Sequence, residues 1–532
     1  MIIRFNNFRG MAPVLLPEKL PLGMAQSAAN CRFESGGIVP LRQPLPVVTP
    51  AKAGVKQSIY PYGSPVSWLH WLEDVDCVRG AVASDGFDRV YWSGDAAPKM
   101  SVAGFITQGG TQYPTNSYNL GLPRPGTPTA ATIGTAGTDI ATQETRAYVV
   151  TFVTAYGEES IPSLPTAALT VDLATQTVGI SNLPTAPSGA YNVATKNIYR
   201  ASTGSSATEY QYVGSVAIAT TTYEDSILPA NLGEVLPSET WLAPNSGMKG
   251  LIACPGGFLA GFYGNVLCFS EPYMPHAWPA AYQMIMNSPI VALGSYGNSI
   301  LVTTSGAPVV VTGEHPASMS KPEYLESGEA CVSKRGLVDL GYSIAYPGVS
   351  GLWLVGTGGI NNVTANIMNE EQWRALSPAT LLGTEYAGAY VGLLAAGGGF
   401  ILDAQGNYST LEVTATAAHY DRETGKLFLM VGNDIVEWCG GSTFYTAVWK
   451  SGKVVLPKAI NLGCAKVLAQ SYPLTAKVYA DGALVCTKSV TSAAPFRLPD
   501  GFTGSVWEME ITGGSGVYDA VLATSMLDLA QV

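Results

Sequence analysis

Short apolar runs, each closed by a glycine or proline turn, recur along most of this chain and constrain its fold more than any other feature. From residue 246 onward these runs come in pairs, and the pairs return at intervals of about 40–50 residues, the length of one propeller blade. A small sheet with two apolar faces can bury both by stacking radially against its neighbours, which closes a ring. We therefore expect blades at five pairs of runs: 257–263 with 265–270, 299–303 with 307–312, 343–346 with 351–355, 390–394 with 399–403, and 426–431 with 434–438.

The composition favours short strands over helices. Only 13% of the residues are charged, about half the usual share, whereas the chain has 59 glycines, 35 prolines and 27 tyrosines. Few Lys and Glu residues with many aromatic and β-branched ones indicate strands joined by tight turns. No apolar period of 3.6 is sustained over many turns, which argues against helical solenoids and coiled coils. We predict an all-β protein, a β-propeller-like ring of antiparallel blades with an inserted sandwich.

Residues 121–242 interrupt the blade pattern. A stiff, proline-rich linker at 121–128 leads to a cleanly alternating run at 146–154 and a turn at 156–160. Six or seven short strands in a stretch of this length are typical of an immunoglobulin-like or fibronectin-III-like sandwich, and the missing cysteine pair favours the fibronectin-like version. The further strands are expected at 168–171, 177–180, 197–201, 210–216 and 221–223.

A chain of 532 residues is several times a typical domain length, so several units are expected. Prolines keep the first 50 residues extended, apart from one short helix expected at 25–31. Such an arm lies either on its own domain or on a neighbouring subunit, and the sequence leaves both possibilities open. The predicted parts are 1–50 (extended segment), 51–120 (first blade-like region), 121–242 (inserted fibronectin-III-like domain), 243–445 (propeller-like blades) and 446–532 (C-terminal β region that closes or docks on the ring).

The sequence offers no group of residues spaced for metal binding or catalysis. Its four histidines, at positions 70, 276, 315 and 419, form no H-x-x-H pattern, so each is expected to be a structural or surface residue. No EF-hand-like loop occurs, and the glycine clusters at 356–359 and 397–399 lack the following Lys-Ser/Thr of a phosphate-binding loop. We predict a non-enzymatic protein without cofactor or metal. The acidic residues that stand out are expected at turns or on the surface: Asp85, Asp88, Glu158, Glu159, Asp403 and Asp434.

Charge and cysteine usage limit the partners and the compartment. The net charge is −11 and no basic stripe is present, so the chain lacks the footprint that holds nucleic-acid phosphates; a neutral-to-acidic wall would instead let DNA slide past. The eight scattered cysteines are expected to be small buried hydrophobic residues in a reducing cytosol. The N-terminus has no signal-peptide pattern, and no run of 18 apolar residues predicts a membrane span.

Three stretches resemble the nozzle proteins (tail tubular protein B-like) of short-tailed bacteriophages. The first is 20–30 with 35–42, in which A-x-x-A-x-N precedes G-x-I-x-P-x-R. The second is 251–279, which contains GGFLAGFYGNVLCFSEPYMPHAWP. The third is 445–529, with W-K-S-G-K, P-F-R-L-P, W-E-M-E-I and L-A-T-S-M-L-D-L in that order.

The resemblance implies a virion structural protein, assembled in the host cytoplasm as a ring of six copies below the portal and adaptor. Such a ring would extend the DNA-ejection channel and anchor fibres or spikes, so its partners would be further copies, the adaptor, the fibres or spikes, and genomic DNA passing without specific binding. The family offers no catalytic residue. The alternative is a carbohydrate-binding or polysaccharide-depolymerising tailspike or adhesin. The nearest match to a sialidase Asp-box, at 84–88, has the wrong spacing and no repeat, and the short repeats of a long β-helix are missing.

Overall fold

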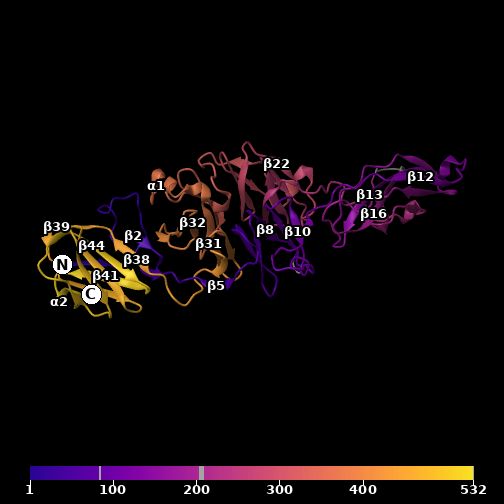
Figure 1. Ribbon diagram of the computed structural model, residues 1–532. Coiled ribbons are helices and arrows are strands. Elements are labelled where there is room, and N and C mark those ends of the chain that lie inside the picture. Colours follow the sequence, from indigo (N-terminus) through magenta and orange to yellow (C-terminus); the bar gives the residue numbers. More distant parts are fainter. Residues whose placement is uncertain (83–84, 203–208, 531–532) are drawn as a thin grey trace.

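The computed structural model describes residues 1–82, 85–202 and 209–530, and these are nearly all β. Three units lie in a line (Figure 1), and we name them by their residues: the terminal unit (1–42 and 446–530), the propeller-like unit (43–122 and 243–445) and the inserted unit (123–242). The described residues form two short α-helices, α1 (Glu370–Ala375) and α2 (Met526–Ala530). Their 3-10 turns are η1 (Ile140–Thr142), η2 (Pro229–Asn231), η3 (Ala280–Tyr282), η4 (Pro316–Ser318), η5 (Lys334–Gly336) and η6 (Pro378–Thr380).

The propeller-like unit consists, in its described residues, of six antiparallel four-stranded groups and one hairpin. Three groups are β8–β11 (Asp76–Arg79, Val90–Ser93, Lys99–Ser101, Tyr118–Asn119), β19–β22 (Lys249–Ala253, Leu259–Tyr263, Val266–Phe269, Gln283–Ile285) and β23–β26 (Ile290–Tyr296, Ser299–Thr304, Val309–Thr312, Glu323–Tyr324). The others are β27–β30 (Val338–Asp339, Ser343–Pro347, Leu352–Gly356, Gly359–Asn362), β31–β34 (Leu382–Tyr386, Ala389–Leu393, Gly399–Leu402, Tyr408–Leu411) and β35–β37 (Ala418–Asp421, Lys426–Val431, Asp434–Glu437) with β5 (Leu45–Val48). The hairpin is β6 (Ser58–Tyr62) with β7 (Ser67–Trp71).

The first strands of these groups follow one another in space. β8 lies beside β19, β19 beside β23, β23 beside β27, β27 beside β31, β31 beside β35, and β35 beside β6. The β6–β7 hairpin then packs on the β8–β11 sheet, where the rings of Trp71 and Trp92 are 5.8 Å apart, so the series returns to its start. All five predicted pairs of runs are strands here, and the small antiparallel sheets confirm the expectation of a propeller-like, all-β protein.

Tight hairpins explain the glycine content of these sheets. β20 and β21 pair from Ala260↔Phe269 to Tyr263↔Val266, which leaves two residues to reverse the chain. One of them, Gly264, has a φ of 58°, a left-handed conformation that other residues rarely adopt.

The inserted unit is a pair of sheets packed face to face. Tyr148, Val150, Val178, Ile180 and Ile198 form much of the core between them. One sheet holds β12 (Thr129–Gly134), β15 (Gln176–Ser181) and β18 (Tyr223–Asp225). The other holds β14 (Leu169–Asp172), β13 (Gln143–Thr154), β16 (Val193–Ser202) and β17 (Gln211–Ala217).

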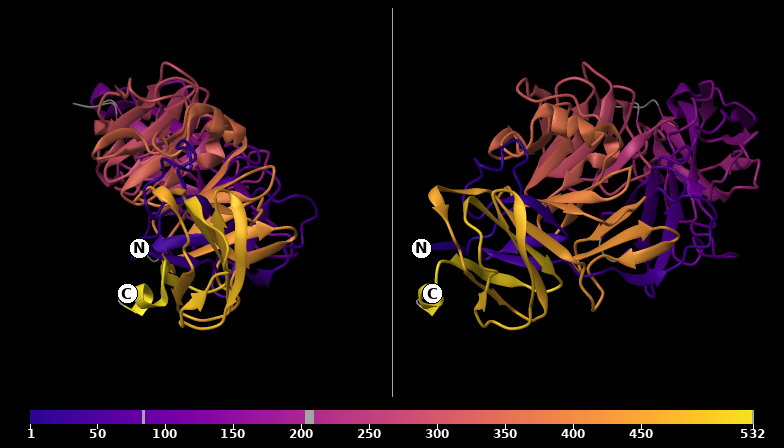
Figure 2. Two further views of the ribbon diagram at one scale, coloured as in Figure 1. Left: turned by 90° about the vertical axis from the view of Figure 1, so that its left-hand side faces the viewer. Right: turned by 60° about the vertical axis from the view of Figure 1, so that its left-hand side comes forward.

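The terminal unit combines strands from both ends of the chain, as both views of Figure 2 show. One sheet has β3 (Cys31–Glu34), β4 (Gly37–Pro40), β45 (Val517–Ala523), β40 (Cys464–Ala469) and β43 (Phe496–Arg497), with β1 (Ile2–Phe5) also on β45. The other has β2 (Ala25–Ala29), β38 (Ala447–Ser451), β44 (Gly504–Gly513), β41 (Leu474–Ala480) and β42 (Ala483–Val490), with β39 (Val454–Ile460) also on β44. Because β2 also pairs with β34, this second sheet continues into the propeller-like unit.

The helix predicted at 25–31 is wrong, because β2 begins at Ala25 and β3 follows directly. Ala28 lies opposite Trp449 in the β2–β38 ladder and is fully buried. Tertiary pairing of this kind overrides the helical preference of alanine. The open question about the N-terminal arm is answered too: the rings of Phe5 and Phe8 lie 5.7 and 4.7 Å from that of Trp449, so the arm lies on its own chain.

Candidate functional site at the axis of the propeller-like unit

Two adjoining cavities lie where the first strands of the propeller-like unit converge. The first, about 260 Å³, is lined by residues of β6, β8, β31, β35 and η5. The second, about 490 Å³, is lined by β8, β27, β31 and β35. The two share Cys77, Leu337 and Gly383, so they follow each other along the axis. Charged side chains line both cavities, which makes this axis the candidate functional site.

Lys334 of η5 bridges to the opposite side of the first cavity. Its Nζ lies 3.0 Å from Asp74 Oδ2 and 2.8 Å from Asp76 Oδ2, next to the start of β8. Burial alone would lower the pKa of Lys334, but the two carboxylates together have the larger, opposite effect. The pKa of Lys334 is therefore raised and its ammonium stays charged. Asp76 Oδ2 also accepts the Gly250 N–H of β19 at 3.0 Å. Lys334 therefore ties η5 to the start of β8, and Asp76 in turn links β8 to β19.

Arg335, the next residue, extends this contact to two further sheets. Its Nη2 donates to the carbonyl of Gln57, before β6, at 2.7 Å and to that of Thr416, before β35, at 2.6 Å. Burial lowers the pKa of this guanidinium. We call Lys334, Arg335, Asp74 and Asp76 the axial clamp.

A second ionic bridge crosses the other cavity. Arg422 Nη2, in the turn between β35 and β36, lies 3.0 Å from Asp339 Oδ1 of β27 and 3.2 Å from Glu385 Oε2 of β31. Each cavity therefore holds a cation that pairs with two carboxylates from other elements of the fold.

Three further ionisable groups at the axis, His419, Cys77 and Tyr60, have pKa values shifted in favour of their neutral forms. Burial lowers the pKa of His419 to about 4, and its ring lies edge-on to Tyr60 at 5.1 Å. Burial also raises the pKa of the Cys77 thiol well above its ordinary value, and that of the Tyr60 hydroxyl. Lys334 is paired and the Cys77 thiol is protonated. The contacts between sheets at the axis are therefore made by Lys334, Arg335 and Arg422.

A second polar cluster lies at the junction of the propeller-like and inserted units. Arg89 Nε is 2.7 Å from Asp85 Oδ2, and its Nη1 is 3.5 Å from Glu158 Oε1 of the inserted unit. The rings of Phe87 and Tyr156 pack edge-on across the same junction at 4.8 Å. The sequence singled out Asp85 and Glu158 separately as turn or surface residues, whereas the structure brings both to one arginine.

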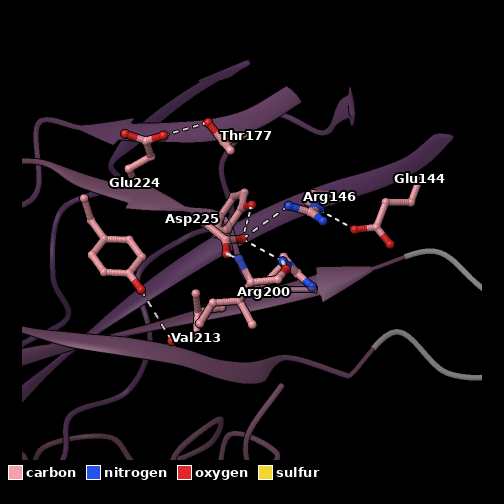
Figure 3. Close-up of polar contacts among 10 residues, drawn as sticks. Glu144, Arg146, Thr177, Arg200, Val213, Glu224 and Asp225 are labelled. Atoms are coloured by element: carbon pink, nitrogen blue, oxygen red, sulfur yellow. Dashed lines mark hydrogen bonds and ion pairs between the residues drawn. The ribbon is translucent and has the colours of Figure 1, made fainter. Parts of the chain in front are cut away.

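A third cluster is buried inside the inserted unit (Figure 3). Arg200 Nη1 and the Tyr148 hydroxyl each donate to Asp225 Oδ2 at 2.7 Å, and Arg146 Nη1 lies 3.5 Å from the same oxygen. Arg146 also pairs with Glu144. Asp225 and the three side chains that meet at it are all buried, so this cluster is internal to the inserted unit.

The other residues singled out in the sequence are structural where the structure describes them. His70 Nδ1 lies 2.9 Å from the Trp68 carbonyl, and His315 Nδ1 accepts the Ala317 N–H at the start of η4. Asp403 holds its own turn by accepting the Asn407 N–H at 2.8 Å. Within residues 1–82, 85–202 and 209–530, no group of three or more His, Cys, Asp or Glu residues could hold a metal ion, and all eight cysteines are free.

Sequence reasoning missed the axial clamp. Its available signal was the pair Lys334–Arg335, two adjacent cations in a chain with few charges. Among the described residues, no helix has the length and apolar character needed to cross a membrane.

Comparisons with known proteins leave the family undetermined. No protein-family model matches this chain, and no curated protein matches it. A structure of BBS1N in complex with ARL6DN is similar with a TM-score of 0.30 at 10% identity, over 75% of this chain and 97% of that chain. Virginiamycin B lyase from Staphylococcus aureus gives 0.29 at 10% identity over 69% and 98%, and PorZ of Porphyromonas gingivalis gives 0.27 at 9% over 90% and 71%. Similarities with TM-scores this low carry no argument about the fold, activity or partners of this chain.

Proposed function

We propose that this chain is a structural subunit of a short-tailed bacteriophage tail, a nozzle-like component without enzymatic activity. Its copies would form a ring, of six in the resembled family, that extends the DNA-ejection channel below the portal and adaptor. The ring would also anchor fibres or spikes. In this proposal the propeller-like series is a closed ring of blades, and the inserted unit is a fibronectin-III-like sandwich that projects from it.

One observation carries the proposal: stretches of the resemblance that lie far apart in the sequence meet in one unit. The first stretch, 20–30 with 35–42, provides β2, β3 and β4. The third, 445–529, provides β38 to β45. They pair directly, with Ala28 opposite Trp449 and Ile38 opposite Val517. The residues that carry the resemblance therefore pair with one another in one unit, which supports the proposal.

The axial clamp supports the same assignment. The ionic groups at the axis are engaged with each other and with backbone groups of neighbouring sheets, an arrangement suited to a subunit that must stay rigid. A protein whose task is mechanical needs such cross-links between its small sheets.

Imaging of virions tests the proposal. Antibody against the inserted unit, with gold detection, should label the tail of intact particles, and isolated tails should show the protein as a ring. A chain that is absent from purified virions would refute the assignment. Release of reducing ends from host polysaccharide by the purified protein would instead support the tailspike alternative.

A further inference from the structure

Charge is divided unequally between the units. The terminal unit contains 12 Lys and Arg residues against 8 Asp and Glu residues, so it carries +4. The rest of the chain contains 16 against 31 and carries −15. The overall charge of −11 therefore hides a basic end and an acidic body, and opposite charges on one molecule allow copies to attract each other head to tail.

Exposed apolar side chains gather on the basic end. Leu16 and Leu22 are 67% and 60% exposed, and Val455 of β39 is 58% exposed. Leu16 and Leu22 lie in the loop between β1 and β2, and this loop adjoins the start of β39, because the Lys453 N–H donates to the Pro17 carbonyl at 2.9 Å. We call this surface the basic apolar patch; its residues are Val14, Leu15, Leu16, Lys19, Leu22, Val455 and Lys458, all exposed.

The loop that carries this patch is firmly held. The Val14 N–H donates to the Ile367 carbonyl at 2.9 Å, and Lys453 Nζ lies 2.8 Å from Glu18 Oε1. Gln372 Nε2 of α1 donates to the Pro13 carbonyl at 2.9 Å. Apolar side chains presented on a preordered backbone lose little conformational entropy on docking, which suits a protein interface.

A complementary surface lies on the propeller-like unit. Ile285 at the edge strand β22 is 72% exposed and Tyr273 is 56% exposed. Two contacts join this edge to β23–β26: the Tyr324 hydroxyl accepts the Asn287 N–H at 3.0 Å, and the Tyr282 ring lies 6.3 Å from that of His315. We call it the acidic apolar patch; its residues are Tyr273, Met274, Ile285, Glu314, Glu323 and Glu326, all exposed, and Lys321 is exposed beside Glu323 without reversing the acidic balance.

We propose that the basic apolar patch of one copy docks on the acidic apolar patch of the next. Two basic patches facing each other would repel, so the contact is heterologous rather than twofold. A heterologous contact repeats from copy to copy and gives either a closed ring or a filament. This inference rests on the proposed function and deepens it, because it names the surfaces through which a ring would assemble.

Charge reversal tests the pairing. Lys19→Glu with Lys458→Glu, or Glu323→Lys with Glu326→Lys, should each weaken self-association at least about tenfold, and combining both pairs should restore it. The measurement is sedimentation velocity at several protein and salt concentrations, with circular dichroism to verify folding. Lys488→Glu on the exposed edge strand β42 of the same unit is the matched control and should leave assembly unchanged.

Three outcomes would overturn the inference. One is assembly that survives both reversals, and the second is a combined variant that does not recover. The third is binding of the native chain to phosphatidylglycerol vesicles that depends on Lys19 and Lys458 without self-association, which would make the patch a lipid-binding surface. Failure here is distinguishable from failure of the proposed function. A chain that labels tails but assembles through other surfaces refutes only this inference, whereas a chain that assembles as described but is absent from virions refutes only the nozzle assignment.

Discussion

The Arg200 guanidinium and the Asp225 carboxylate lie 2.7 Å apart inside the inserted unit, and neither side chain is exposed. A buried ion pair contributes little net stability when compared with apolar residues of the same size, but losing one partner leaves an uncompensated charge. We therefore expect Asp225→Ala to destabilise the inserted unit by about 3–5 kcal/mol. Hydrogen exchange of β13 and β16 measures this effect on that unit alone.

The control for this prediction is an exposed ion pair. Arg374 and Glu370, four residues apart on α1, are both more than half exposed, so Arg374→Ala should cost less than about 1 kcal/mol. If the two variants lost the same free energy of unfolding, the importance assigned to the buried ion pair would be contradicted.

Removal of the clamp lysine should destabilise the propeller-like unit in a pH-dependent way. In Lys334→Met, Asp74 and Asp76 lose their shared cation, and burial already raises the pKa of Asp76. A carboxyl whose folded pKa lies above its unfolded value loses stability as pH rises through the folded pKa. The cost of the substitution should therefore be larger at pH 7 than at pH 4, as measured by urea unfolding. Lys477→Met, which breaks a surface pair with Glu510, is the control and should show a small cost.

Acid should weaken the protein through His276 at the junction of the propeller-like and inserted units. Burial, with a contribution from nearby Arg89, lowers its pKa from 6.5 to about 4. Between these pH values the unfolded chain binds more protons than the folded one, so stability falls as pH falls, by up to about 3 kcal/mol. Urea unfolding at pH 7, 5.5 and 4.5 should show a smaller acid loss for His276→Gln than for the native chain. Identical pH dependence in the two would rule His276 out as the cause.

The N-terminal segment that follows β1 should be required for the stability of the terminal unit. Phe8 is buried with its ring 4.7 Å from that of Trp449, so Phe8→Ala should cost about 3–5 kcal/mol through cavity formation. The near-ultraviolet circular dichroism of Trp449 measures the loss of this packing directly, because the signal depends on the contact with Phe8. Leu16→Ala, on the exposed loop nearby, should leave both the signal and the unfolding midpoint unchanged.

The local sequence pattern predicts the positions of the strands well. It does not predict which strands pair when they lie far apart in the sequence. The run predicted at 426–431 coincides with β36, and that at 146–154 lies within β13. Both are apolar runs closed by turns, so the information is local. The strand at Ala25–Ala29 was predicted as helix, because its β character comes from Trp449, more than 400 residues away.

The candidate site was missed for the same reason. Lys334 and Asp74 are 260 residues apart, and only the spatial order of the sheets brings them together. In the sequence, Asp74 and Asp76 look like any carboxylates beside a turn. The composition could exclude classes of function, but it could not show that these two residues pair with Lys334.

The terminal unit combines β1 to β4 with β38 to β45, and this has a consequence for the order in which the units fold. The Met1 amino group donates to Thr524, 523 residues further along. During translation, β1 to β4 leave the ribosome long before their partners β38 to β45 exist. The propeller-like and inserted units can thus fold while the nascent chain is attached, but the terminal unit can be completed only after β45 has emerged. If the basic apolar patch drives assembly as proposed, only copies translated through β45 present it in its final form, and products that stop earlier are excluded from the growing ring.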